Sequence, residues 1–211
     1  MRSSPRVKDV DDFELLRAWQ AGDRRAGSEL VQRNFQVLFR FFRNKIDDNP
    51  TDLIQQTLTT CVEVRDRVPG GASFRAYALG IARNKLLHHL RRAQRQANAM
   101  RLQANAPVSV GDSPSQILAA RQEQRLLLAA LRKLPLDAQI AIELFYWEGL
   151  KIDEIAAVLE VAPGTVKSRL SRAKEQLREH IATLAVTEDL RRSTMDELAH
   201  WVASLREAAS R

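Results

Sequence analysis

Residues 150–174 read LKIDEIAAVLEVAPGTVKSRLSRAK, which is the most specific structural pattern in the chain. Apolar residues three and four positions apart predict a short amphipathic helix over residues 152–159. A tight turn is expected at Glu160–Ala162. Pro163 then suits the first turn of a second helix over 163–184, because its missing N–H costs nothing there. The spacing predicts a helix-turn-helix that spans Lys151 to Arg178.

The second helix of this pair has two different sides. Val166, Leu170, Ala173 and Leu177 are spaced four, three and four residues apart, which predicts the buried side. Small polar residues and cations, which suit base edges and phosphates, fall elsewhere on the helix: Thr165, Lys167, Ser168, Ser171 and Arg172. From Pro163 to His180 there are five Lys or Arg and two Glu. A solvated hairpin with a basic face is the alternative, but the turn and the Pro-Gly-Thr start favour binding in the major groove.

Helical periodicity continues through most of the chain and predicts an all-α protein. Thr51 and Ser73 are the expected N-caps of the third and fourth helices. We expect Phe35, Phe39 and Phe42 in the core. Helices are expected over residues 11–21, 24–46, from 51 toward 69, 74–95, 114–133, 136–148, 152–159, 163–184 and 189–208.

The composition changes over residues 96–115, where small, polar and turn-forming residues replace the apolar periodicity. This stretch is predicted to be a flexible linker between two small helical domains, residues 1–95 and 116–184. Residues 185–211 are expected to add a C-terminal amphipathic helix. Two interpretations of the helical segment 187–211 remain open: it packs on the second domain, or it regulates activity by contacting a partner.

Bulk composition excludes several classes of protein. The 211 residues are 45% hydrophobic and 28% charged, which is typical of a folded domain with a core. A net charge of +7 suggests a polyanionic partner. Cys61 is the only cysteine, so neither an internal disulfide nor a Cys-based zinc site is expected. We find no catalytic cluster and expect no metal and no cofactor. No signal peptide or membrane-spanning run of about 18 residues is evident, which favours a cytoplasmic protein without membrane insertion.

A second basic segment lies in the N-terminal half. Residues 83–95 contain five cations and no Asp or Glu, so the helix can follow a phosphate backbone. Asn84 and His88 lie one turn apart, and Asn can bind the edge of an unpaired base. The loop 69–72 is expected to shape a pocket for an everted base. Tyr77 either stacks on a base or belongs to the core.

Both halves resemble the extracytoplasmic-function class of bacterial RNA polymerase sigma factors. GLKIDEIAAVLEV followed by PGTVKSRLSRAKEQLRE is similar to sigma region 4. LLRAWQAGDRRAGSELVQRNFQVLFRF and DLIQQTLTTCVEVRDRV are similar to the start of region 2 and its polymerase-binding segment. ASFRAYALGIARNKLLHHLRR is similar to the promoter-melting helix of region 2. The resemblance covers about residues 11–184, in the order that the family has.

The resemblance implies a non-enzymatic initiation factor that binds core RNA polymerase and promoter DNA and helps to open the promoter. An anti-sigma factor remains a possible third partner. The implied readers of the −35 duplex are Lys167, Ser168, Ser171 and Arg172, with Thr165 and Arg169 as phosphate contacts. The residues implied for the unpaired −10 strand are Tyr77, Arg83, Asn84, His88, Arg91 and Arg92. The residues implied for polymerase binding are Asp52, Gln55 and Gln56, and the family usually has a carboxylate where Gln56 stands.

Two other classes of function compete with this one. A helix-turn-helix regulator with an N-terminal sensor domain is the main rival, but a receiver-type sensor needs alternating strands and helices, which residues 1–95 do not show. An enzyme acting on nucleic acid needs an acid–base or metal-binding cluster, which the sequence lacks. Reconstitution with core RNA polymerase distinguishes the three classes.

Overall fold

The computed structural model describes residues 11–46, 49–68, 73–103, 122–185, 187–192 and 194–195. The chain forms two compact units, one up to Gln103 and one after it. Over these described ranges the regular structure is helical, with no strand. The prediction of an all-α protein is therefore confirmed.

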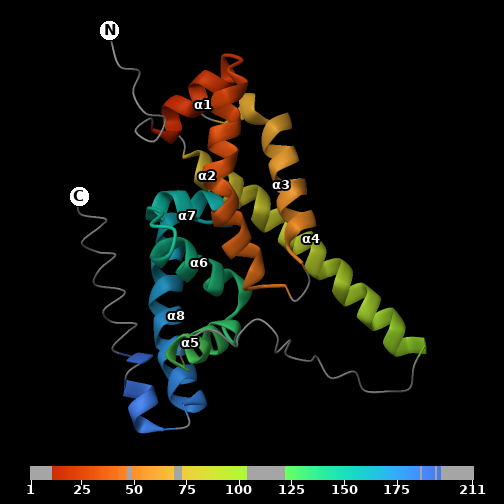
Figure 1. The fold of residues 1–211 in the computed structure, drawn as a ribbon. Helices are drawn as coiled ribbons and strands as arrows, with labels where there is room; N and C mark the ends of the chain where they lie inside the picture. Colours follow the sequence, from red (N-terminus) through yellow and green to blue (C-terminus); the bar gives the residue numbers. More distant parts are fainter. Residues whose placement is uncertain are drawn as a thin grey trace. The chain divides into compact units, whose positions relative to one another are not determined.

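The first unit contains α1 (Asp12–Gln20), α2 (Arg24–Arg43), α3 (Thr51–Glu63), the short 3-10 helix η2 (Arg65–Arg67) and α4 (Phe74–Gln103) (Figure 1). Helix α2 packs against α1, α3 and α4, and α3 packs along α4. The fully buried side chains of this unit include Leu30, Leu38, Phe42, Ile54, Cys61, Leu79 and Leu86. Burial raises the pKa of the Cys61 thiol to about 12.

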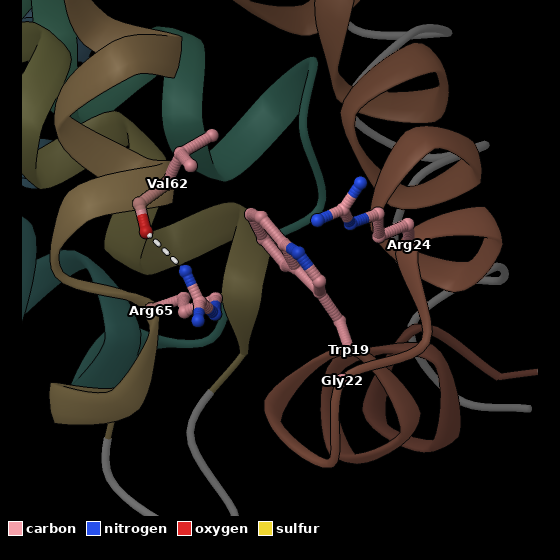
Figure 2. Close-up of a pocket in the computed structure, with 5 residues that line it drawn as sticks. All are labelled: Trp19, Gly22, Arg24, Val62 and Arg65. Atoms are coloured by element: carbon pink, nitrogen blue, oxygen red, sulfur yellow. Dashed lines mark hydrogen bonds between the residues drawn. The ribbon is translucent and has the colours of Figure 1, made fainter.

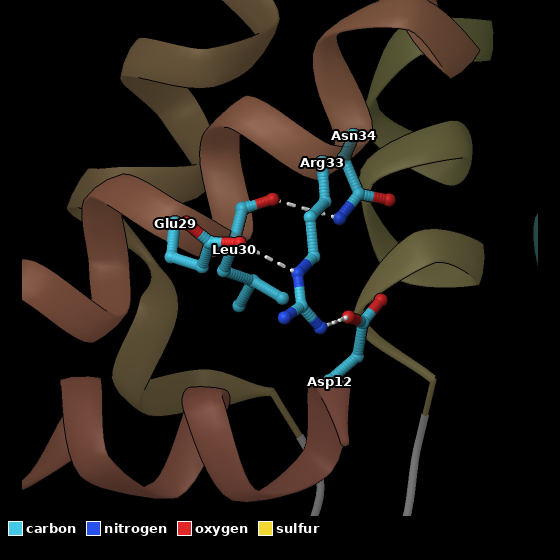
Figure 3. A network of polar contacts seen from close by, with 5 residues as sticks. All are labelled: Asp12, Glu29, Leu30, Arg33 and Asn34. Carbon is cyan, nitrogen blue, oxygen red and sulfur yellow. Dashed lines mark hydrogen bonds and ion pairs between the residues drawn. The ribbon is translucent and has the colours of Figure 1, made fainter. Parts of the chain in front are cut away.

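A polar network fixes α1 against α2. The Arg33 guanidinium reaches both helices: Nη1 lies 3.2 Å from Oδ1 of Asp12 in α1, and Nε lies 2.9 Å from Oε1 of Glu29 (Figure 3). The hydrogen bond to Glu29, with a further contribution from Asp12, raises the pKa of Arg33. Beside it the buried Asn34 donates from Nδ2 to the carbonyl oxygen of Leu30. These contacts orient the N-terminal helix of the unit.

The second unit contains α5 (Gln122–Arg132), α6 (Leu136–Tyr146), α7 (Ile152–Leu159) and α8 (Pro163–Leu184). Helix α8 packs against the other three (Figure 1). Between α7 and α8, Glu160 adopts the left-handed conformation with φ 56°, which ends α7 and turns the chain. The predicted bounds of α7 and α8 are confirmed. The buried side chains of this unit include Ile140, Leu144, Ile155, Val166, Ala173, Leu177 and Ile181.

The predicted linker begins too early, because α4 continues to Gln103 instead of ending near Arg95. The sequence after Arg95 is rich in Ala, Gln, Met, Leu and Arg, which are good helix formers, and its first proline is Pro107. A hydrogen bond of 3.0 Å from Nε2 of Gln94 to Oδ1 of Asn98 also bridges one turn. Local helix propensity therefore extends the helix after the apolar periodicity has ended.

Two other local predictions also fail. Thr51 is the first residue of α3 and not its N-cap; Oδ1 of Asn49 instead accepts from the Thr51 N–H and hydroxyl. Phe35 is 39% exposed, because the buried stripe of α2 runs through Asn34, about 100° away around the helix. The Ser73 cap is confirmed, since its Oγ accepts from the N–H of Ala76.

Some expectations lie outside the described residues. They include the loop 69–72, the remainder of the linker, the start of the helix predicted at 114, and residues 196–211 of the C-terminal extension. Within that extension, residues 188–192 and 194–195 are helical.

Candidate nucleic-acid interface

The packing of α8 determines which side chains remain at the surface. Val166, Ala173 and Leu177 are at most 1% exposed to solvent, because α8 packs on the other helices of the unit. Five of the predicted contact residues are consequently exposed: Thr165, Lys167, Ser168, Ser171 and Arg172. Residues 165, 168, 171 and 172 form one stripe at three- and four-residue spacing, and Lys167 lies to one side of it. The structure therefore brings these residues together, and we call this set the α8 face.

The polar groups of the α8 face are available to a ligand. Ser168 donates from its hydroxyl to the carbonyl oxygen of Thr165, at 3.0 Å, which leaves the hydroxyl oxygen as an acceptor. Lys167 and Arg172 make no hydrogen bond or ion pair with any part of the chain that the structure describes. Long cations beside small polar residues form a surface that can approach base edges and hold phosphates.

Arg169 differs from the other predicted residues of α8. Its Nη1 lies 3.4 Å from Oδ2 of Asp137 in α6, and the side chain is partly buried. On the same helix, Nζ of Lys174 lies 5.4 Å from the centre of the Tyr146 ring, also in α6. Both cations therefore help to hold α8 on α6. They leave Lys167 and Arg172 as the exposed cations of the α8 face.

Helix α4 carries a second candidate surface. Tyr77, Asn84, His88, Arg91 and Arg95 are spaced seven, four, three and four residues apart, so they follow one line along the helix. All are exposed except Tyr77, which is half-buried. We call these five residues the α4 stripe. No Asp or Glu occurs between Phe74 and Gln103, so no carboxylate of α4 competes for its cations.

The other two predicted residues of α4 lie beside this stripe. Arg83 is half-buried and lies about 100° from Asn84 around the helix, whereas Arg92 is exposed. Residues 91–98 are exposed on all sides of the helix, which projects beyond the rest of its unit (Figure 1). The projecting turns present Arg91, Arg92 and Arg95 to solvent. The half-buried Tyr77 leaves both its stacking role and its core role open.

The predicted polymerase-binding residues share the outer side of α3. Asp52, Gln55 and Gln56 are exposed, while Ile54, Thr57 and Cys61 face the core. The hydroxyl of Thr57 donates to the carbonyl oxygen of Leu53, so the buried side of α3 has no free polar group at this position. A polar outer side remains for a partner.

The first unit also contains a pocket around Trp19, which none of the sequence patterns indicates. It has a volume of about 480 Å³ and is lined by Trp19, Gly22, Arg24, Val62 and Arg65 (Figure 2). Gln20 ties α1 to η2 by donating from Nε2 to the carbonyl oxygen of Arg65, at 2.9 Å. Because this contact joins residues far apart in the sequence, no local pattern could have indicated the pocket.

The described residues contain no group of three or more His, Cys, Asp or Glu that could hold a metal ion. None of the helices among them is long and apolar enough to cross a membrane.

Known proteins share both halves of this arrangement. Residues 30–96 match the family Sigma-70 region 2, and residues 124–177 match Sigma-70, region 4. The ECF RNA polymerase sigma factor SigM of Mycobacterium tuberculosis is 31% identical over 86% of this chain and 90% of its own length. The ECF RNA polymerase sigma-E factor of Salmonella typhimurium is 24% identical over 81% and 94% of the two chains.

A solved structure supports the same assignment. The sigma factor RpoE of Bartonella quintana, crystallised with the anti-sigma factor NepR, is 25% identical, with a TM-score of 0.61 over 75% of this chain and 98% of that chain. Its fold, the two family matches in order and the relative with 31% identity agree. The chain therefore belongs to the extracytoplasmic-function (ECF) family of RNA polymerase sigma factors, which are promoter-recognising transcription initiation factors and not a class of enzymes.

Proposed function

We propose that the α8 face reads the −35 element of the promoter as duplex DNA. Ser168, Ser171 and Arg172 approach base edges in the major groove, where small residues allow close contact and Arg can bind guanine through two hydrogen bonds. Lys167 completes this set of readers, and Thr165 contacts a phosphate. Arg169, whose Nη1 lies 3.4 Å from Oδ2 of Asp137, contacts a DNA phosphate by exchanging this ion pair.

The α4 stripe contacts the −10 element in its unpaired form. Asn84 and His88 supply polar groups for an exposed base, and Arg91 and Arg92 bind the phosphates that follow. Arg83 contributes from its half-buried position. Tyr77 stacks on a base of the opened strand, a contact that an aromatic side chain makes with little regard to sequence.

The outer side of α3 binds core RNA polymerase through Asp52, Gln55 and Gln56. The chain itself performs no catalysis, because the polymerase supplies the reaction. It acts in the cytoplasm, where the polymerase and the promoter are. An anti-sigma factor is a further proposed partner, since the similar RpoE was solved with one.

One observation carries this proposal. Two separate units each present a line of exposed cations and hydrogen-bonding side chains, and neither line is paired with carboxylates in the described part of the chain. Two joined units can contact two elements of the same DNA, and the polymerase that holds them raises their effective concentration there.

Reconstitution with core RNA polymerase tests the proposal. The purified chain should bind core and start transcription from members of a promoter library. Asp52→Lys should lower affinity for core, while Glu14→Lys, an exposed charge reversal on α1, should not. Failure of the chain to bind core, or transcription that starts without sequence preference, would contradict the proposed function.

A further inference from the structure

The pocket around Trp19 has the chemistry of a nucleotide site. Figure 2 shows the indole of Trp19 between Arg24 on one side and Val62 and Arg65 on the other. The Arg65 guanidinium lies 6.0 Å from the ring centre, and the Val62 side chain is 42% exposed. An aromatic and apolar wall beside two cations suits a flat base with its phosphate.

The two cations of this pocket, Arg24 and Arg65, differ in the hydrogen bonds and ion pairs that they make. Arg65 donates from Nη1 to the carbonyl oxygen of Val62, at 3.1 Å, and its Nε lies 3.6 Å from Asp66. Arg24 is exposed and makes no ion pair with the described residues. Arg24 is therefore the cation that is free to hold a phosphate, and Arg65 is held in place beside the ring.

The pocket lies at the N-terminal end of α4. Trp19 packs edge-on against Phe74, the first residue of that helix, with ring centres 6.0 Å apart. The basic part of the α4 stripe lies toward the other end of α4, so the pocket is a separate site on the same unit. Because the −35 element is proposed to be read as duplex DNA, the unpaired nucleotides beyond the −10 element lie downstream of it.

We propose that this pocket binds a nucleotide of the unpaired promoter strand, downstream of the −10 nucleotides that contact the α4 stripe. The base lies mainly against Val62 and touches the small exposed part of Trp19, and its phosphate contacts Arg24. This inference rests on the proposed function, because it needs an opened promoter. It adds a third DNA contact, which stabilises the open complex without contributing to duplex recognition.

Arg24→Glu tests the charge of the pocket, and Arg25→Glu is the matched control. Both arginines are exposed in the first turn of α2, but only Arg24 lines the pocket. Holoenzyme affinity is measured on two forked templates, one with and one without unpaired nucleotides downstream of the −10 element. Arg24→Glu should weaken binding about tenfold on the longer template alone, since a phosphate contact becomes a repulsion. Arg25→Glu should change it less than about twofold by the same reasoning.

Val62→Trp tests the space in the pocket without changing its charge. The larger side chain should fill the site and reduce binding to the longer template, with no effect on the shorter one. Abasic substitutions in that template then identify the nucleotide. Removing the base at one position should weaken binding of the wild-type holoenzyme, and the same removal should not weaken binding of Val62→Trp any further.

Three outcomes would overturn the inference. Arg24→Glu and Arg25→Glu could behave alike, or the Arg24→Glu defect could be equal on both templates. Alternatively, Arg24→Glu could weaken binding to core polymerase without DNA, which would make the pocket a protein-docking site. If wild-type holoenzyme opens promoters while Arg24→Glu and Val62→Trp are unchanged, only this inference fails. If wild type opens no promoter, the proposed function fails with it.

Discussion

The backbone of Gly27 lies against the indole ring of Trp19 so closely that no side chain fits between them. A Cβ at position 27 would lie 2.7 Å from Cε2 of the ring and closer still to Nε1. Trp19 is only 8% exposed, and its ring also packs against Phe74. Because position 27 has no side chain, the Trp19 ring fits against the backbone of α2. There it forms the wall of the pocket and joins α1, α2 and α4.

Gly27→Ala should destabilise the first unit. The added methyl group overlaps the indole, and overpacking of this kind typically costs about 1–3 kcal/mol. Chemical denaturation followed by Trp fluorescence measures the change. Gly164→Ala is the matched control, because a Cβ there meets nothing within 4 Å. A Gly27→Ala variant as stable as the wild type would show that the ring moves without cost.

Arg172→Ala tests the α8 face. If the guanidinium binds a guanine through two hydrogen bonds, the substitution should cost about 1–3 kcal/mol and relax base preference at one or two positions. Binding to a set of single-base −35 variants measures both effects. Arg178→Ala provides the comparison, as another exposed cation farther along α8. An equal loss on every sequence would make Arg172 a phosphate contact.

Tyr77→Ala and Tyr77→Phe together decide the role of this half-buried ring. If the ring stacks on an unpaired base, Tyr77→Ala should lower open-complex stability by about 1–3 kcal/mol, whereas Tyr77→Phe keeps the stacking. Permanganate reactivity of unpaired thymines reports promoter opening, and thermal unfolding of the free protein reports the fold. A large loss of thermal stability in Tyr77→Ala, with normal opening by the folded fraction, would assign Tyr77 to the core.

Cys61 should resist alkylation in the native protein. Its side chain is completely buried, and burial raises its pKa to about 12, so the reactive thiolate does not form at neutral pH. The native pKa is higher than that of an unfolded thiol. The buried, protonated Cys61 thiol therefore contributes fully to the free energy of unfolding below about pH 8.5, the usual thiol pKa. This contribution is lost as the pH rises from there toward the native pKa. Labelling kinetics with a thiol reagent, compared with and without denaturant, provide the measurement. Native labelling as fast as that of the unfolded chain would contradict this burial.

The sequence predicted those parts of the fold that depend on local pattern. The apolar spacing of Val166, Leu170 and Ala173 determines which side of α8 is buried, and the structure agrees with it. The extent of α4 past Arg95 was missed, because polar residues with high helix propensity continue a helix that has no apolar stripe. Periodicity alone also placed Phe35 in the core, where the structure instead buries Asn34.

The two candidate surfaces could also be predicted from local pattern. Each lies on a single helix, so the helical period alone indicates the side on which Ser168, Arg172 or Asn84 lies. The Trp19 pocket could not be predicted in this way, because Arg24 and Val62 meet only through tertiary packing. A pocket formed between separate helices depends on side-chain volumes, such as the missing side chain of Gly27, that a pattern of polar and apolar residues does not record.

The most direct test of two-element promoter recognition is selection of transcribed promoters from a randomised DNA library by the reconstituted holoenzyme. The account predicts two short preferred elements at a fixed spacing. Arg172→Ala should alter preference in the upstream element alone, and Asn84→Ala in the downstream element alone. Enrichment of a single element, or two variants that alter the same positions, would contradict the assignment of α8 and α4 to separate parts of the promoter.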